Sequence, residues 1–170
     1  KVADLPYGRF RDKGTPLDNL CNYSSTEEEI LRIEGLNAVK STNLLFATQQ
    51  GMIKKVEGTE FDVSKRTIAS TKLTDGDKLI AVLLIGEEEQ IVLQSIDGYF
   101  LRFMLEEVPV KKKAAIGVRG MKMNAKDQLL QVHLLTPNGD DIAIYKDKEV
   151  HLNRLRISKR DAKAVKTRVS

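Results

Sequence analysis

The chain has 170 residues, 28 Lys and Arg against 24 Asp and Glu, and a formal net charge of +4. Its single cysteine, Cys21, excludes an intrachain disulfide and a cysteine-rich metal site. The longest apolar run, Leu79 to Ile85, is far shorter than the roughly 18 residues of a membrane-spanning helix. We therefore expect a cytoplasmic domain without a membrane partner, whose mild positive charge is compatible with a polyanionic ligand.

Short runs of apolar and β-branched residues alternate with turn signals along the chain, and this pattern predicts an all-β fold. Residues 1–36 are expected to form a partial unit, because Lys13–Leu20 parallels Ile116–Met123 and Glu28–Ile33 can supply a last strand. Two complete units and another partial one follow at 44–85, 91–135 and 141–170. The strands expected in the complete units are 44–48, 52–56, 66–73, 78–85, 91–95, 99–104, 115–123 and 128–135.

The complete units repeat each other. The hairpin FATQQGMIKKVEGTEF, Phe46–Phe61, recurs 47 residues later. Gly98 then stands at the position of Gly51 (98 − 51 = 47), and Arg102 at the position of Lys55. Four strands per repeat of about 47 residues is typical of a propeller-like array, in which each unit packs its apolar face on its neighbour. We therefore predict about three and a half four-stranded antiparallel blades.

The last partial unit fits the first complete unit at an offset of 96 residues, which puts Asp147 in the place of the turn glycine Gly51 and His151 in the cation position of Lys55. Because one blade cannot cover its own apolar face, we expect Phe46 and Phe103 to be buried at or near the interfaces between units. His133 lies inside an expected strand and is interpreted as structural.

Charge is distributed unevenly over the repeat. Acidic residues gather at two hairpin tips, Glu27–Glu29 and Glu87–Glu89, whereas residues 109–126 contain six cations and no acid. If the repeats are radial, the cations form a basic outer rim of the kind that binds a nucleic-acid backbone. The rim residues are Lys54, Lys55, Lys65, Arg66, Arg102, Lys111, Lys112, Lys113 and Arg119. A solvated lysine-rich surface is the better explanation of any one of these residues, and it is their recurrence at equivalent positions that favours a site.

Neither base reading nor catalysis is indicated. Aromatic residues make up 5% of the chain and there is no Trp, so contacts to DNA should go mostly to phosphate. The sequence lacks a glycine-rich phosphate loop, zinc-ligand spacing and a nucleophile with a neighbouring base. We assign no catalytic residue, metal site or cofactor to this chain, which is expected to be a binding module.

The hairpin motif and the stretch AAIGVRGMKM, residues 114–123, resemble the C-terminal domain of the A subunit of bacterial type IIA topoisomerases, DNA gyrase and topoisomerase IV. The resemblance covers most of the chain and implies a β-pinwheel whose blades borrow strands from their neighbours and whose basic perimeter bends or wraps DNA. It adds further perimeter residues: Arg9, Arg11, Lys13, Arg156, Lys159 and Arg160.

The same resemblance implies a parent enzyme that carries the catalytic tyrosine elsewhere, binds ATP and Mg outside this domain, and assembles an N-terminal cleavage core with an ATPase B subunit on the nucleoid. The glycine-rich basic heptapeptide that marks gyrase is not in this chain, and GRFRDKG, Gly8–Gly14, is similar to topoisomerase IV. We favour topoisomerase IV and leave gyrase open.

Two functions follow for testing. The first is sequence-tolerant binding and bending of duplex DNA along the basic rim, as an accessory domain of a type IIA topoisomerase. The alternative is a propeller-like protein-interaction module that binds an acidic partner, in which a few Arg or aromatic anchors would dominate affinity.

Overall fold

The computed structural model describes residues 5–167, which form two compact units, one ending at Leu31 and one starting at Arg32. In the first unit, the described residues contain a short 3-10 helix, η2 (Leu17–Asn19), and turns, but no strand. Asp18 accepts hydrogen bonds from the backbone N–H and hydroxyl of Ser25 at 3.1 and 2.6 Å, and these bonds lower the pKa of its carboxyl.

The strand expected at Glu28–Ile33 does not form, and the prediction was wrong. Ile30 and Ile33 are 43% and 75% exposed, and no strand of the described chain pairs with this segment. A strand needs a partner for its backbone groups and a layer to cover its apolar face, and the segment has neither.

The second unit begins with a short helix, α1 (Leu36–Lys40), followed by the first sheet. The sheet has the order β3-β1-β2-β6 and consists of β1 (Asn43–Thr48), β2 (Met52–Glu57), β3 (Leu79–Leu84) and β6 (Val118–Arg119). A 3-10 helix, η3 (Gly58–Phe61), follows β2. β1 is central and buried on both faces, which explains its almost continuous apolar sequence.

The second sheet repeats this arrangement. Its main path has the order β10-β5-β4-β7, with β11 also paired to β5. Its elements are β4 (Gln90–Ser95), β5 (Tyr99–Met104), η4 (Leu105–Glu107), β7 (Leu129–Leu135), β10 (Ile157–Ser158) and β11 (Val165–Lys166). All the pairs are antiparallel except β5 with β10. The two predicted hairpins and the strands that flank them, β3 and β7, are therefore confirmed.

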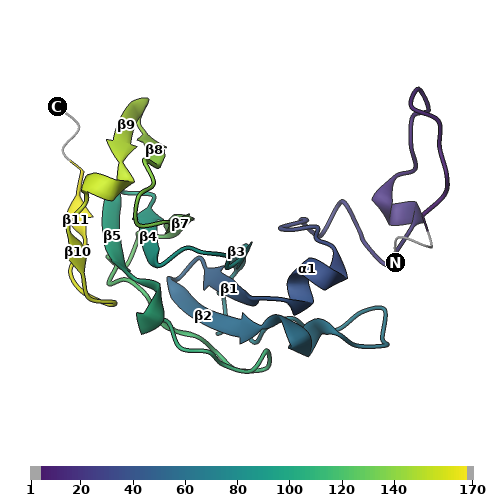
Figure 1. Cartoon of the computed structure of the whole chain (residues 1–170), viewed down its shortest axis with the longest axis horizontal. Coiled ribbons are helices and arrows are strands. Elements are labelled where there is room, and N and C mark those ends of the chain that lie inside the picture. Colours follow the sequence, from purple (N-terminus) through teal and green to yellow (C-terminus); the bar gives the residue numbers. More distant parts are fainter. Residues whose placement is uncertain (1–4, 168–170) are drawn as a thin grey trace. The chain divides into compact units, whose positions relative to one another are not determined.

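Each sheet takes an outer strand from the next repeat, β6 in the first sheet and β11 in the second. Figure 1 shows β11 and β10 beside β5. Val118 of β6 pairs with Ile53 of the first sheet, and Val165 of β11 pairs with Phe100 of the second, so the two pairings are 47 residues apart. The prediction that 66–73 and 115–123 are third strands of their own repeats was wrong. The segment 66–73 forms no strand, and the segment 115–123 contributes only the two residues of β6, which pair with the preceding sheet. Gly117 and Gly120 make this pairing possible, because a side chain at either position would collide with Ile53.

The last hairpin consists of β8 (Ile142–Tyr145) and β9 (Lys148–His151), followed by η5 (Leu152–Arg154). Its turn residues Lys146 and Asp147 both have left-handed φ angles, 49° and 61°, as a two-residue hairpin turn requires. In the earlier hairpins only Gly51 and Gly98 are left-handed, with φ of 82° and 81°. The last hairpin is thus shorter rather than a copy with one glycine replaced.

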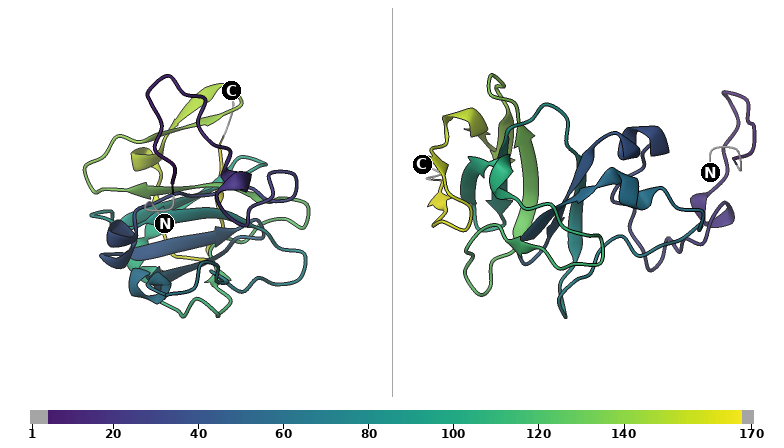
Figure 2. Two further views of the ribbon diagram at one scale, coloured as in Figure 1. Left: turned by 90° about the vertical axis from the view of Figure 1, so that its right-hand side faces the viewer. Right: turned by 60° about the horizontal axis from the view of Figure 1, so that its bottom comes forward.

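The main apolar core lies between the two sheets, which face each other in the right-hand view of Figure 2. It includes Leu45 and Ile53 from the first sheet and Leu93 and Phe103 from the second, all at most 1% exposed. Phe46 is also buried, at 3%, but lies in a separate cluster on the other face of the first sheet. The predicted burial of both phenylalanines is confirmed, and only Phe103 lies in the core between the sheets.

Candidate nucleic-acid interface

Three loops leave the 3-10 helices at equivalent places, and they contain most of the cations singled out above. We call them loop 1 (residues 62–78), loop 2 (108–117) and loop 3 (155–164). The helices before them begin at Gly58, Leu105 and Leu152, 47 residues apart. Loop 2 runs beside β2, where the N–H of Lys55 donates to the Pro109 carbonyl at 3.0 Å. Loop 3 runs beside β5 through β10, so loops 2 and 3 have the same place on successive sheets.

Each loop presents one exposed lysine at the same position: Lys65, Lys112 and Lys159. They follow one another at the repeat interval of 47 residues. The side chain of Lys112 is 80% exposed although its Nζ lies 3.4 Å from Oε1 of Glu60. An ammonium so exposed remains free to meet another anion.

The next residue in loops 2 and 3 is held inward by a glutamate of the preceding repeat. The backbone N–H of Lys113 donates to Oε2 of Glu60 at 2.9 Å, and its Nζ donates to the Glu60 carbonyl at 3.0 Å. Arg160 makes the same two contacts with Glu107, from its N–H at 2.9 Å and its Nε at 3.1 Å. The Lys113 N–H, which is the largest cause, lowers the pKa of Glu60, so this carboxylate is ionised at neutral pH.

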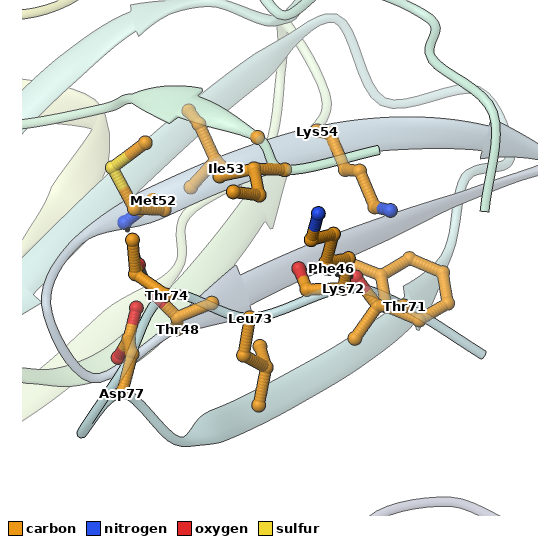
Figure 3. Close-up of a pocket in the computed structure, with 12 residues that line it drawn as sticks. Phe46, Thr48, Met52, Ile53, Lys54, Thr71, Lys72, Leu73, Thr74 and Asp77 are labelled. Carbon is orange, nitrogen blue, oxygen red and sulfur yellow. Dashed lines mark hydrogen bonds between the residues drawn. The ribbon is translucent and has the colours of Figure 1, made fainter. Parts of the chain in front are cut away.

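Lys54 is buried rather than exposed on a rim, with 2% of its surface accessible. Its Nζ donates to the carbonyls of Lys112, Lys113 and Ala115 at 3.3, 2.8 and 2.7 Å and lies 5.6 Å from the ring centre of Phe46. Figure 3 shows Lys54 and Phe46 at one side of a small cavity. Burial lowers the pKa of this ammonium, and the carbonyls compensate for its lost hydration. Lys54 therefore fastens loop 2 to the first sheet.

Arg102 is also buried, at 7% exposure. Its guanidinium donates to Oε1 of Gln90, to the Asn153 carbonyl and, at 2.9 Å, to the Leu155 carbonyl. Lys55, its repeat equivalent, is half-buried, and its Nζ donates to the Leu105 carbonyl at 3.3 Å. The expectation that Lys54 and Arg102 lie on an exposed rim was wrong, because both satisfy carbonyl groups of the next repeat.

Arg119 is exposed but paired. Its Nε and Nη2 donate to the two carboxylate oxygens of Asp161 at 2.7 and 2.9 Å, which raises the pKa of the guanidinium and lowers that of the carboxyl. The Nη1 of Arg160 donates to the Arg119 carbonyl at 2.7 Å. Loop 3 therefore covers the charge of Arg119 with an acid that loop 2 lacks.

The structure places the remaining predicted cations as follows. Lys111 is half-buried in loop 2, Arg156 is exposed in loop 3, and Arg66 is exposed in loop 1 with interactions of its own. In the first unit, Arg9, Arg11 and Lys13 are exposed. Thus the second unit brings together part of the predicted set, and the exposed members are concentrated in its loops.

The repeat architecture matches a known family. The family described as "DNA gyrase C-terminal domain, beta-propeller" matches residues 42–85 and 89–135, which are the two complete repeats. The chain belongs to this family. It is thus a C-terminal β-pinwheel domain of the kind found in the A subunits of gyrase and topoisomerase IV.

Relatives from both enzymes resemble this gyrase-type domain. The A subunit of DNA gyrase from Chlamydia pneumoniae is 32% identical over 142 residues, which cover 81% of this chain and 17% of the relative. The A subunit of DNA topoisomerase 4 from Streptococcus pneumoniae serotype 4 is 37% identical over 135 residues, covering 76% and 16%. The chain therefore spans about a sixth of the length of these relatives.

Solved structures agree with this assignment. The C-terminal domain of DNA topoisomerase IV has a TM-score of 0.83 at 25% identity, over 96% of this chain and 53% of that one. The C-terminal domain of DNA gyrase A has a TM-score of 0.74 at 24% identity, over 92% of this chain and 53% of that one. At 24% identity, the similarity to the gyrase A domain is evidence for the fold only.

The cavity beside Lys54 cannot hold a cofactor in this gyrase-type domain. Its volume is about 10 Å³, the space of one water-sized group, and Asp77 lies at the opposite end from Lys54 (Figure 3). Within residues 5–167, no three His, Cys, Asp or Glu side chains are grouped so that they could hold a metal ion. The same residues include no helix long and apolar enough to cross a membrane.

Sequence reasoning missed the two glutamates that hold the loops. Glu60 and Glu107 are 47 residues apart, and each precedes its cation, Lys113 or Arg160, by 53 residues. A search for acids that recur in phase with the cations would have found them. The sequence could not show that Lys113 and Arg160 turn inward while the preceding residues, Lys112 and Lys159, stay exposed.

Proposed function

We propose that this domain binds duplex DNA with little sequence preference through the exposed cations of its three loops, and that it bends the duplex as an accessory domain of a type IIA topoisomerase. The observation that supports this most directly is the exposure of Lys65, Lys112 and Lys159 at one repeat interval. Arg156 adds to the positive surface of loop 3. Arg9, Arg11 and Lys13 are proposed as further contacts from the first unit.

Phosphate is the expected ligand because the charged residues exposed on these loops are mainly Lys and Arg. A lysine ammonium meets a phosphate as a point charge, whereas base reading needs a helix or ribbon placed in a groove. The loops present no such element among the described residues. Affinity should then depend steeply on salt and weakly on sequence.

Bending follows from the repeat. Loops 2 and 3 lie on successive sheets, so one duplex that contacts Lys112 and Lys159 has to pass from one sheet to the next. Smooth bending of a 20–30 base-pair site costs on the order of 1–6 kcal/mol, which several added phosphate contacts can offset. We therefore propose a bent path rather than a straight contact.

In the whole protein we propose that the domain works on the bacterial nucleoid, beside an N-terminal cleavage core in the same chain and together with an ATPase B subunit. The relatives that support this are named as A subunits of gyrase and topoisomerase 4. ATP and Mg would bind outside this domain. The choice between the two enzymes, with topoisomerase IV favoured, also remains a proposal.

The test compares two triple variants by fluorescence anisotropy with one linear duplex over a range of salt concentrations. Changing Lys65, Lys112 and Lys159 to Ala should weaken binding at least tenfold and reduce the slope of log K against log salt by up to about three, since each phosphate contact contributes about 0.9. The matched control changes Lys122, Lys126 and Lys148, which are exposed and lie outside the three loops, and removes the same charge.

Equal losses in the two triple variants would contradict the proposed site, because they would reflect net charge alone. Energy transfer between dyes on the two ends of the duplex reports the bend, which should appear with wild type. If an acidic polypeptide of matched charge binds as tightly as the duplex and competes with it without salt dependence, the protein-interaction alternative replaces DNA binding.

A further inference from the structure

Two glutamates occupy a basic surface where a negative charge is unfavourable for a phosphate ligand. Glu60 lies in η3 and contacts loop 2, and Glu107 ends η4 and contacts loop 3. Oε1 of Glu60 lies 3.4 Å from Nζ of Lys112, the exposed lysine of loop 2. On Coulomb's law alone, removing these acids should improve the binding of a polyanion.

The contacts of the glutamates indicate a different role. In each case a carboxylate oxygen accepts the backbone N–H of a loop residue, Lys113 or Arg160, and the backbone carbonyl of the glutamate accepts a bond from the side chain of that residue. The four distances lie between 2.9 and 3.1 Å, and the two sets are one repeat apart. Main-chain bonds to a carboxylate fix the path of a loop that has little strand pairing of its own.

The fixed path sets the direction of the neighbouring lysine. In loop 2, the carbonyls of Lys112 and Lys113 point to the buried Nζ of Lys54, while the N–H of Lys113 points to Glu60. With these peptide groups engaged on the protein side, the side chain of Lys112 is left on the solvent side, where it is 80% exposed. In loop 3, the N–H of Arg160 points to Glu107 as that of Lys113 points to Glu60, and the preceding Lys159 is exposed.

We propose that Glu60 and Glu107 are positioning residues of the DNA site, which hold Lys112 and Lys159 in a fixed direction for the phosphate backbone. The inference rests on the proposed function. A lysine already held in the binding direction loses less conformational entropy when it binds a phosphate. This smaller entropy cost outweighs the repulsion between the phosphate and the nearby glutamate carboxylate.

The experiment separates charge from position by comparing two replacements of equal charge. Glu60→Gln and Glu60→Ala both remove one negative charge, but glutamine keeps an oxygen that can accept the Lys113 N–H. We expect the alanine variant to bind duplex DNA at least fivefold more weakly than the glutamine variant, and more weakly than wild type. Glu107→Ala and Glu107→Gln should behave alike, which gives a second test if one of the alanine variants folds poorly.

The matched controls are two exposed acids, Glu57 directly before η3 and Glu106 within η4. Their alanine and glutamine variants should bind equally well, because neither side chain holds a loop backbone. Limited trypsin digestion adds a readout without DNA: Glu60→Ala should increase cleavage after Lys112 several-fold, whereas Glu60→Gln should not.

Three outcomes are decisive. If Glu60→Ala and Glu60→Gln bind equally tightly, or both bind more tightly than wild type, the positioning role is wrong and DNA binding stands. If the glutamate variants change trypsin cleavage but wild type does not bind duplex, the proposed function is wrong and the positioning role for DNA falls with it. If alanine weakens binding and glutamine does not, the positioning role is supported.

Discussion

Loop 2 on β2 and loop 3 on β5 have the same backbone pairing, yet different side chains fasten them. At the first junction, Lys54 reaches three carbonyls of loop 2. At the second junction the repeat equivalent of Lys54 is the buried Leu101, and Arg102 binds the carbonyls of Asn153 and Leu155 instead. A cation that recurs at equivalent positions can thus hold two neighbouring repeats together and need not bind a ligand.

The largest expected effect is on stability. We expect Arg102, which is buried, to contribute more to the free energy of unfolding than its half-buried repeat equivalent Lys55. Arg102→Met removes the donor to Gln90 and to two backbone carbonyls, and buried acceptors without partners cost about 1–3 kcal/mol each. We expect a loss of about 3 kcal/mol in the free energy of unfolding, measured by urea denaturation. Lys55→Met, which removes one bond of 3.3 Å from a half-buried side chain, should cost less than about 1 kcal/mol.

Equal costs for the two methionine variants would mean that burial does not distinguish these positions. Arg156→Met serves as a control for the loss of an exposed arginine from loop 3 and should change stability by less than about 0.5 kcal/mol.

The hairpins could be predicted from the sequence because local signals determine them. Gly51 and Gly98 follow apolar runs and adopt the left-handed φ that glycine tolerates, and the strands on each side alternate or stay apolar as their burial requires. The repeat interval also carried over to the pairing of β6 and β11 with the preceding hairpin.

The third strands and the direction of the cations could not be predicted in this way. Segment 66–73 has strand-like composition but no strand partner in the described chain, and pairing depends on distant residues. The side chains of Lys54 and Lys55 are adjacent in sequence on opposite faces of β2, yet Lys54 is buried only because the carbonyls of loop 2, about 60 residues later, surround its ammonium. Charge alone does not reveal such an acceptor set.

A second difference between the sheets concerns polarity, and it makes the second sheet sensitive to pH. Nε2 of His133 lies 3.0 Å from Oε1 of Gln94, whose amide donates to the Ile144 carbonyl of the last hairpin at 3.2 Å. At the equivalent places the first sheet has Leu83 and Ala47. Burial lowers the pKa of His133 below its usual 6.5, against a smaller opposite effect of Asp141.

The sign follows from proton uptake. As the pH falls below 6.5, His133 takes up a proton in the unfolded chain at a higher pH than in the folded chain. The free energy of unfolding is therefore at its full value above pH 6.5 and decreases as the pH falls toward the pKa of His133 in the folded chain. One proton limits the slope to about 1.4 kcal/mol per pH unit. Thermal unfolding between pH 7.5 and 5.5 should show this loss in wild type and a smaller one in His133→Leu, which introduces the residue of the first sheet. An unchanged pH profile in the variant would assign the sensitivity to other groups.

The smallest expected effect concerns the acid that distinguishes loop 3 from loop 2. Asp161→Asn should leave the fold intact, because asparagine tolerates the φ of 62° at this position and the lost ion pair is partly exposed. Freed from its carboxylate partner, Arg119 can meet a phosphate, so duplex affinity should rise a few-fold and the salt slope should steepen by about 0.9. Asp140→Asn removes the same charge from an exposed aspartate outside the loops and should raise affinity less, with no change in slope. If both variants raise affinity equally, Arg119 adds no phosphate contact when it is released, and loop 3 differs from loop 2 only in net charge.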